Sequence, residues 1–239
     1  MLVTRIGLLN TKILWITLAT VLVALFFWDT PFLLPLKVFV VLLHEISHGL
    51  AALLTGGSVE KLMLLSDQGG LAFTRGGNRF VILSAGYLGS ALWGALFMQL
   101  AWSRSSIRSY AIHFIGIVLL LVLVLYIRDL YTIGYVSLTM FVILLIGSWG
   151  GDRLKMAILW IVGTFSCLYA VIDIFTDILA DGPFAGLSLF GSLSGFSNDA
   201  QLLSTITYIP AFIWGLLWSG LAIAIFLLNI YSLASRRYF

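Results

Sequence analysis

Long apolar runs recur along the chain, and short polar breaks that carry most of the charge separate them. A helix that crosses a membrane needs about 20 mainly apolar residues. The pattern therefore predicts an all-α multi-pass membrane protein with about seven transmembrane helices. They are expected at residues 13–28, 35–55, 79–102, 109–127, 131–149, 155–179 and 206–233. One membrane-embedded domain, residues 1–239, accounts for the whole pattern.

Two connections between these helices are longer than a simple turn. In the first, residues 59–66 and 71–74 resemble two strands around a turn at 67–70, and glycines flank them. This order predicts a small β-hairpin at residues 58–78, directly after the second helix. The second connection, residues 180–205, is rich in Gly and Ser and is predicted to be an irregular loop that dips into the membrane. Irregular backbone at that depth has to be covered by protein or line a wet cavity.

The composition supports the membrane assignment, because 61% of the residues are hydrophobic and only 10% are charged, whereas soluble domains carry roughly 25% charged residues. A lipid bilayer is the expected environment, and the plasma membrane is the expected location. The 13 Lys and Arg are scattered, with no basic run that could follow a phosphate backbone, which excludes nucleic acid as a partner. In the seven-helix arrangement the two membrane faces receive six and seven of these cations, so charge favours neither orientation.

The second predicted helix carries the sequence His44-Glu45-Ile46-Ser47-His48 near its middle. His44 lies about 13 Å from the start of this helix, near the centre of an apolar core about 30 Å thick. Residues i and i+4 share a helix face, so both histidines can bind one tetrahedral zinc ion at about 2.0 to 2.1 Å. Glu45 lies beside the metal, where it can accept a proton from the attacking water and pass it to the departing amine.

The alternative is a purely structural role, in which neighbouring helices satisfy these polar groups. It is disfavoured because an ionisable group at the bilayer centre costs at least about 2.5 to 3.5 kcal/mol and usually marks function. Cys167 is the only cysteine, so a metal has to rely on His, Asp and Glu. The third histidine, His113, is expected to be interfacial because it lies near the polar start of the fourth helix. The sequence therefore predicts one zinc per chain.

Catalytic zinc commonly has three protein ligands, so a third ligand must come from elsewhere in the chain. Asp199 is the first candidate, since it lies where the irregular loop enters the last helix, although it could instead cap that helix. The apolar run beyond it would make a helix of about 52 Å, so either Pro210 kinks it or its start folds inward toward the metal. Asp173 and Asp177, which share a face of the sixth helix, are rival ligands, hold the histidine rings or line a water path.

Five segments carry a likeness to a known family: residues 44–49, 55–57, 74–77, 84–91 and 197–200. With them the chain resembles the site-2 protease family of intramembrane zinc metallopeptidases, in particular the short B-like branch that lacks a PDZ domain. The resemblance implies zinc bound by two His and one Asp, and cleavage of a peptide bond in or near a transmembrane segment of a membrane-protein substrate. Better-known members place their aspartate in a motif that ends Asp-Gly, whereas the only Asp-Gly here, Asp181-Gly182, lies in a loop and is a weak rival site.

The first functional hypothesis is a zinc-dependent intramembrane endopeptidase, with His44, His48 and Asp199 as metal ligands and Glu45 as general base and then acid. The alternative is a zinc-binding membrane transporter or sensor without hydrolytic activity, and a third reading is an inactive relative. Only the enzyme needs Glu45 as a group that does not bind the metal. The free edge of the hairpin is predicted to receive an extended substrate by strand addition.

Overall fold

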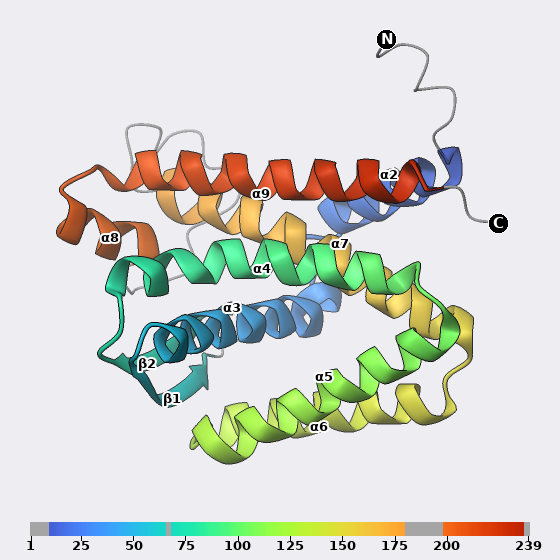
Figure 1. The fold of residues 1–239 in the computed structure, drawn as a ribbon, viewed down its shortest axis with the longest axis horizontal. Coiled ribbons are helices and arrows are strands. Elements are labelled where there is room, and N and C mark those ends of the chain that lie inside the picture. Colours follow the sequence, from blue (N-terminus) through green and yellow to red (C-terminus); the bar gives the residue numbers. More distant parts are fainter. Residues whose placement is uncertain (1–9, 66–67, 180–197, 237–239) are drawn as a thin grey trace, which may run out of the picture.

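The computed structural model describes residues 10–65, 68–179 and 198–236. Its helices run roughly side by side along the long axis of the molecule, and a small sheet lies at one end (Figure 1). The elements are α2 (Thr11–Phe26), η1 (Pro31–Leu33), α3 (Leu34–Leu54), β1 (Ser58–Leu64), β2 (Gly70–Arg75), α4 (Arg79–Ala101), α5 (Ser105–Tyr126), α6 (Leu130–Trp149), α7 (Asp152–Leu179), α8 (Asp199–Thr207) and α9 (Ala211–Ala234). The predicted helical class with a small hairpin is confirmed.

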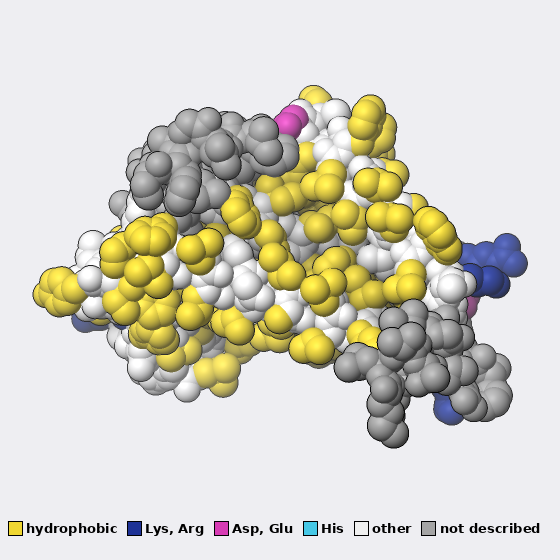
Figure 2. Space-filling view, turned by 90° about the horizontal axis from the view of Figure 1, so that it is seen from above, with side chains coloured by type: hydrophobic (Ala, Val, Ile, Leu, Met, Phe, Trp, Pro, Cys, Tyr) yellow, Lys and Arg dark blue, Asp and Glu magenta, His cyan; other side chains and the backbone are white. Residues whose placement is uncertain are grey.

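Six helices in the described part of the chain are long and apolar enough to cross a membrane: α3 with η1, α4, α5, α6, most of α7, and α9. The first predicted span corresponds to α2, which has only 16 residues. Hydrophobic side chains remain exposed on the outer helix faces, and Figure 2 shows them over much of one broad face. Lipid accommodates such apolar surface, which water does not. The chain is an integral membrane protein.

Polar residues in the short breaks start the helices. The side chain of Asn78 accepts hydrogen bonds from the N–H groups of Phe80 and Val81, at 3.0 and 3.3 Å, where α4 begins. Asp129 accepts a bond of 2.9 Å from the N–H of Thr132 where α6 begins. Such caps satisfy N–H groups that no helical carbonyl reaches. The polar breaks therefore fix where successive antiparallel helices begin.

The hairpin lies between α3 and the connection from α5 to α6. Its strands pair antiparallel, as predicted. Leu62 of β1 bridges to Ile127, and the N–H of Leu64 donates to Oγ1 of Thr132 at 2.9 Å. The outer side of β1 is thus covered by α5 and α6, and both leucines are buried. Both strands also pack against α3.

The helix that carries the two histidines is the most enclosed of the six. In the apolar 18-residue stretch of η1 and α3, 78% is buried inside the protein, whereas in the corresponding stretch of α6 only 17% is buried. α4 packs against α3 and also against α7, where Gly94 and Gly163 allow close approach of the two backbones. A Cβ on Gly94 would lie only 2.6 Å from the carbonyl oxygen of Gly163. Small residues make this kind of contact possible between helices in lipid.

The end of the chain differs in detail from the prediction. Instead of a loop at 180–205 and one helix at 206–233, the structure has the short helix α8 followed by α9. Tyr208, between them, has a left-handed backbone conformation with φ of 58°. Pro210 lacks an N–H and disfavours helical geometry in the residue before it, which favours the break between α8 and α9 at this point. α8 folds back against α4 and α9, and residues 180–197 lie outside the described part.

Candidate metal centre

Three side chains from two distant parts of the chain meet in one place. His44 and His48 lie one turn apart on α3, with ring centroids 4.7 Å apart. Asp199, the first residue of α8, has its Oδ2 atom 3.1 Å from Nε2 of His44 and 3.1 Å from Nε2 of His48. The exposed fraction of each side chain is 14% or less. The fold thus brings Asp199 to the two histidines across 155 residues of sequence.

The start of α8 is held by a reciprocal pair of hydrogen bonds. Oδ1 of Asn198 accepts from the N–H of Gln201 at 2.8 Å, and Oε1 of Gln201 accepts from the N–H of Asn198 at 3.2 Å. Ala200 and Leu203 are fully buried in a cluster with side chains of α4, α7 and α9. Because Asn198 is the cap, the carboxylate of Asp199 faces the histidines and does not serve the helix end.

Neighbouring groups orient both imidazoles. Nδ1 of His48 lies 2.6 Å from the carbonyl oxygen of Ile82, so Nδ1 carries the proton and donates it, and the lone pair of Nε2 points toward Asp199. The ring of Tyr87 meets the ring of His44 edge-on, with centroids 4.8 Å apart. Tyr87 itself packs against Trp218 of α9 at 5.4 Å. Contacts from α4 and α9 therefore fix the direction of both Nε2 atoms.

The three donor atoms fit a tetrahedral zinc site. They all lie within 4.8 Å of one another, and two ligands at about 2.0 to 2.1 Å from zinc with a tetrahedral angle are separated by about 3.4 Å. The two observed separations of 3.1 Å are close to this value. Gly86 leaves the necessary room, because a Cβ there would lie 2.5 Å from Nε2 of His48 and closer still to Nε2 of His44. Two imidazoles and one carboxylate are also donors that zinc accepts.

Glu45 is buried beside this group without belonging to it. The next residue after His44 on α3, it turns toward the hairpin, where β2 begins. A Cβ on Gly70 would lie 2.5 Å from Oε1 of Glu45 and 2.8 Å from Cγ1 of Val41, so only glycine allows the strand this close. The carboxylate of Glu45 thus lies between α3 and β2, in the same cavity as the two histidines and Asp199.

A family model described as Peptidase M50B-like matches residues 17–229. The chain belongs to the Peptidase M50B-like family. The matched region contains α3 with both histidines and α8 with Asp199. The resemblance to site-2 proteases is thereby confirmed, and by family the chain is a membrane metallopeptidase. Comparisons with curated proteins and with solved structures found no match.

In this M50B-like chain a cavity of about 530 Å³ borders His44, His48 and Asp199. Residues of α3, α4, α8 and β2 line it. Tyr169 and Asp173 of α7 also line it. Part of the lining is exposed, at Phe73, Gly76 and Arg79. The cavity therefore opens at the end of the molecule that carries the hairpin.

The other predicted candidates do not join the three donors in the described part of the structure. Asp173 lines the cavity but is not one of the grouped metal-binding side chains. The side chain of Asp177 and the loop residues Asp181-Gly182 lie outside the described part. His113 contacts the carbonyl oxygen of Ser109 through Nδ1 at 2.7 Å, within its own helix α5.

Two glycines near the site were not predicted to contribute to it. Gly70 belongs to the predicted turn at residues 67–70, and Gly86 to the segment 84–91 that carries part of the family likeness. Each is needed because a neighbouring element places a polar side chain against its Cα. A glycine close in sequence to a predicted active-site helix can indicate a close contact with that helix. Which side chain makes the contact becomes evident only from the fold.

Proposed function

We propose that this chain is an intramembrane zinc-dependent endopeptidase that hydrolyses a peptide bond in or near a transmembrane segment of a membrane protein. The observation that carries the proposal is the convergence of His44, His48 and Asp199, with Glu45 buried in the same cavity. If the two histidines and Asp199 had only a structural role, a further buried carboxylate such as Glu45 would not be needed beside them. Ionisable groups are disfavoured at membrane depth, so its presence there indicates function. Membership in a metallopeptidase family adds independent support.

Four side chains have distinct roles in the proposed reaction. His44, His48 and Asp199 would hold zinc, leaving a fourth position open. Zinc bound there would polarise the scissile carbonyl and lower the pKa of water to about 7. Glu45 takes the proton from the attacking water and returns it to the leaving amine. The hydrogen bond from His48 to Ile82 keeps the imidazole in the tautomer that this arrangement requires.

The hairpin offers a way to hold the substrate. β1 is covered by α5 and α6, while residues 70–74 of β2 line the cavity. An extended peptide that pairs with β2 would bring its backbone past Glu45 and the metal group. A transmembrane substrate has to unwind locally first, because a helix satisfies its own carbonyls and shields them from attack. These features favour a substrate segment that is already weak as a helix.

The decisive variant is Glu45→Gln, because it keeps the size of the side chain and removes its ability to take a proton. The matched control is Glu60→Gln, which changes the only other glutamate, an exposed residue of β1. Purified protein in detergent is assayed for zinc content and for cleavage of fluorescein-labelled β-casein and of a labelled transmembrane peptide. We expect Glu45→Gln to retain about one zinc per chain and to lose at least about 100-fold in rate, since general base catalysis contributes about 10²- to 10⁴-fold.

Four results would count against the proposal in different ways. Wild-type protein without zinc would remove the metal site. Zinc binding with no cleavage of either probe by the wild type, together with zinc uptake into vesicles that Glu45→Gln does not affect, would favour the transporter. Equal cleavage rates for wild type and Glu45→Gln would remove Glu45 from the chemistry, and a similar loss in Glu60→Gln would show that the effect is not specific.

A further inference from the structure

Lys37 is a buried cation that the proposed reaction does not yet use. It lies in the first turn of α3 and is only 5% exposed. Lys37 precedes His44 by seven residues, which is about two helical turns, or about 10 Å along the axis. This spacing places Lys37 on the same face of α3 as both histidines. It therefore lies next to the metal group, on the side away from the hairpin.

Aromatic side chains show how deep the ammonium group lies. Nζ of Lys37 is 4.8 Å from the centroid of the Trp28 ring. Trp28 in turn packs on Phe165 and Tyr169 of α7, with ring centroids 4.9 and 6.0 Å apart. Phe165 is about 20 Å from the start of α7, so these rings lie well inside the bundle (Figure 1). An ionisable group at such depth is costly and usually serves a function.

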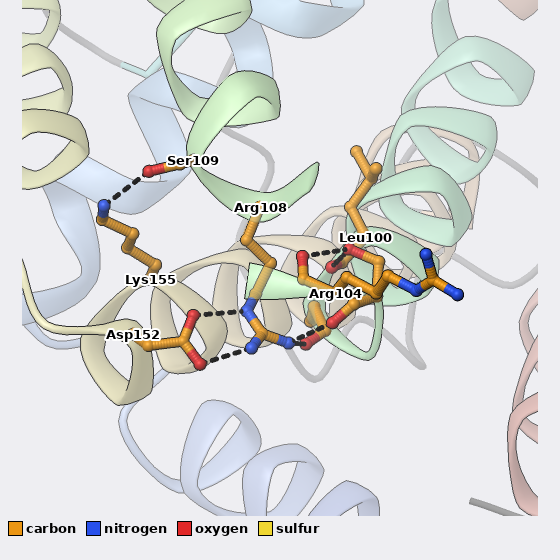
Figure 3. A network of polar contacts seen from close by, with 8 residues as sticks. Leu100, Arg104, Arg108, Ser109, Asp152 and Lys155 are labelled. Carbon is orange, nitrogen blue, oxygen red and sulfur yellow. Dashed lines mark hydrogen bonds and ion pairs between the residues drawn. The ribbon is translucent and has the colours of Figure 1, made fainter. Parts of the chain in front are cut away.

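The other buried lysine in the described part of the chain, Lys155, has a different environment. It lies in the first turn of α7 and donates to Oγ of Ser109 at 2.6 Å. Nearby, the guanidinium of Arg108 binds both carboxylate oxygens of Asp152 and donates to the carbonyl oxygen of Ala101 at 3.0 Å (Figure 3). This network joins the ends of α4, α5 and α7, which gives its lysine a structural role.

Two carboxylates attract the charge of Lys37, those of Asp29 and Asp173. Asp29 directly follows Trp28, is exposed and does not line the cavity. Asp173 lies one turn beyond Tyr169 on α7, and both residues line the cavity. Since Tyr169 also packs on Trp28, the contacts of Lys37 lead to this part of the cavity wall.

Asp173 is the carboxylate in the described cavity lining that the metal group leaves unexplained. Asp199 belongs to the three grouped donors, and Glu45 is buried beside them. Arg79 lines the cavity as well, but it is exposed. A carboxylate taken out of water keeps its charge where a cation or hydrogen-bond donors stabilise it. Lys37 is a buried cation that acts on Asp173 in this way. Buried charge pairs add little net stability, which favours a functional reason for this one.

An extended substrate paired with β2 would keep one edge unpaired. Pairing satisfies the backbone of the peptide on the side of β2, while the other edge presents its N–H and C=O groups to the rest of the cavity. At membrane depth these groups need partners. An ionised carboxylate only accepts hydrogen bonds, and charge-assisted bonds are the stronger kind. Asp173 comes from α7 and not from the hairpin, so it can serve the edge that β2 does not reach.

We propose that Asp173 binds a backbone N–H of the substrate strand, and that Lys37 is a positioning residue whose charge stabilises the Asp173 carboxylate. The inference rests on the proposed function, because it requires a peptide in the cavity. It gives the peptide two binding walls, β2 for one edge and α7 for the other. Removing either charge should weaken peptide binding and leave zinc content unchanged, since neither residue belongs to the grouped donors.

Peptide binding without turnover tests this assignment. The zinc-loaded, full-length Glu45→Gln variant in detergent is titrated against a fluorescein-labelled transmembrane peptide that the wild type cleaves, and fluorescence anisotropy gives the Kd. Lys37→Met and Asp173→Asn are added to this background singly and together. We expect each to raise the Kd about 10-fold, as for the loss of one hydrogen bond to a charged group. The double variant should also stay near about 10-fold and not reach about 100-fold, because both substitutions remove the same interaction.

Two matched controls show whether the effect is specific to the cavity. Asp29→Asn removes the other carboxylate that attracts Lys37, and Lys155→Met removes the other buried lysine, about 27 Å along α7 from Asp173. Each should leave the Kd within about twofold. Peptides with single N-methylated amides locate the bond. At one position methylation should weaken binding about 10-fold, but not when Asp173→Asn is present.

Each part of the inference can fail separately. An unchanged Kd in Asp173→Asn would overturn it, even if Lys37→Met does not fold. Losses that multiply in the double variant, or an equal loss in Asp29→Asn, would remove the role of Lys37. Lower thermal stability with an unchanged Kd would make the pair purely structural, and the absence of a coupled N-methyl position would exclude the backbone N–H. A wild type that neither cleaves nor binds the peptide would instead overturn the proposed function, and this inference with it.

Discussion

The metal site has a weak point that lies outside its ligands, at Gly86 of α4. Replacing Gly86 by Ala removes no donor atom and no charge. The new Cβ would lie 2.5 Å from Nε2 of His48 and closer still to Nε2 of His44. The backbone of α4 cannot move far from these rings, because the same helix packs closely on α7 at Gly94. The imidazoles have to turn away, although the bond from His48 to Ile82 opposes this. Zinc affinity should therefore fall while the fold persists.

The magnitude follows from the packing. Inserting a methyl group into a close-packed site costs about 1 to 3 kcal/mol, and 1.4 kcal/mol corresponds to about tenfold in an equilibrium constant. If the strain falls on the metal-bound arrangement, the Kd for zinc rises by about 5- to 160-fold. Alanine is also the better helix former by about 1 kcal/mol, which partly offsets any loss of stability in the apoprotein. The signature is weaker metal binding without a matching loss of fold.

Competition with a zinc-selective fluorescent chelator measures this Kd in detergent-purified protein, and thermal unfolding of the apoprotein measures stability. The matched control is Gly134→Ala in α6, another helical glycine whose added Cβ would have no neighbour within 4 Å. We expect the control to bind zinc like the wild type. Equal zinc affinity in Gly86→Ala and wild type would refute the reasoning, because it would mean that the metal is not held where His44 and His48 converge on Gly86.

Asp199→Ala should reduce zinc content in dialysed protein to well below one per chain, while Asp173→Asn should leave it unchanged; the opposite pattern would make Asp173 the third ligand. Arg108→Ala should lower the free energy of unfolding by about 1 to 3 kcal/mol, because it leaves buried carbonyls without a donor. Arg104→Ala, at an exposed neighbour, should stay within about 0.5 kcal/mol by chemical denaturation. Similar losses in both arginine variants would contradict the role of the network in Figure 3.

Much of the site could be predicted because half of it is local. His44, Glu45 and His48 lie within one turn or so of one helix, and helical periodicity alone places the two histidines on one face. The hairpin was also predictable, since its turn and its flanking glycines lie close together in the sequence. The polar cap at the start of α4 follows from the same local chemistry.

The other half depends on packing between distant segments. The sequence offered Asp199, Asp173 and Asp177 as ligands, and only the fold of α8 against α4 and α9 brings Asp199 to 3.1 Å from both histidines. The last apolar run is too long for one straight membrane helix, so a break in it could be predicted. That the break would lie at Tyr208, with its left-handed backbone conformation, could not be predicted.

The division of the site between α3 and α8 has a thermodynamic consequence for the protein. The carboxylate of Asp199 reaches the histidines only while α8 stays docked, and docking relies on the buried Ala200 and Leu203 and on the cap at Asn198. A ligand that binds only the docked state stabilises it, by about 2.7 kcal/mol at a concentration 100 times the Kd. Zinc would thus stabilise the contact between α3 and α8, so that removing the metal would abolish the chemistry and lower the stability of the docked α8.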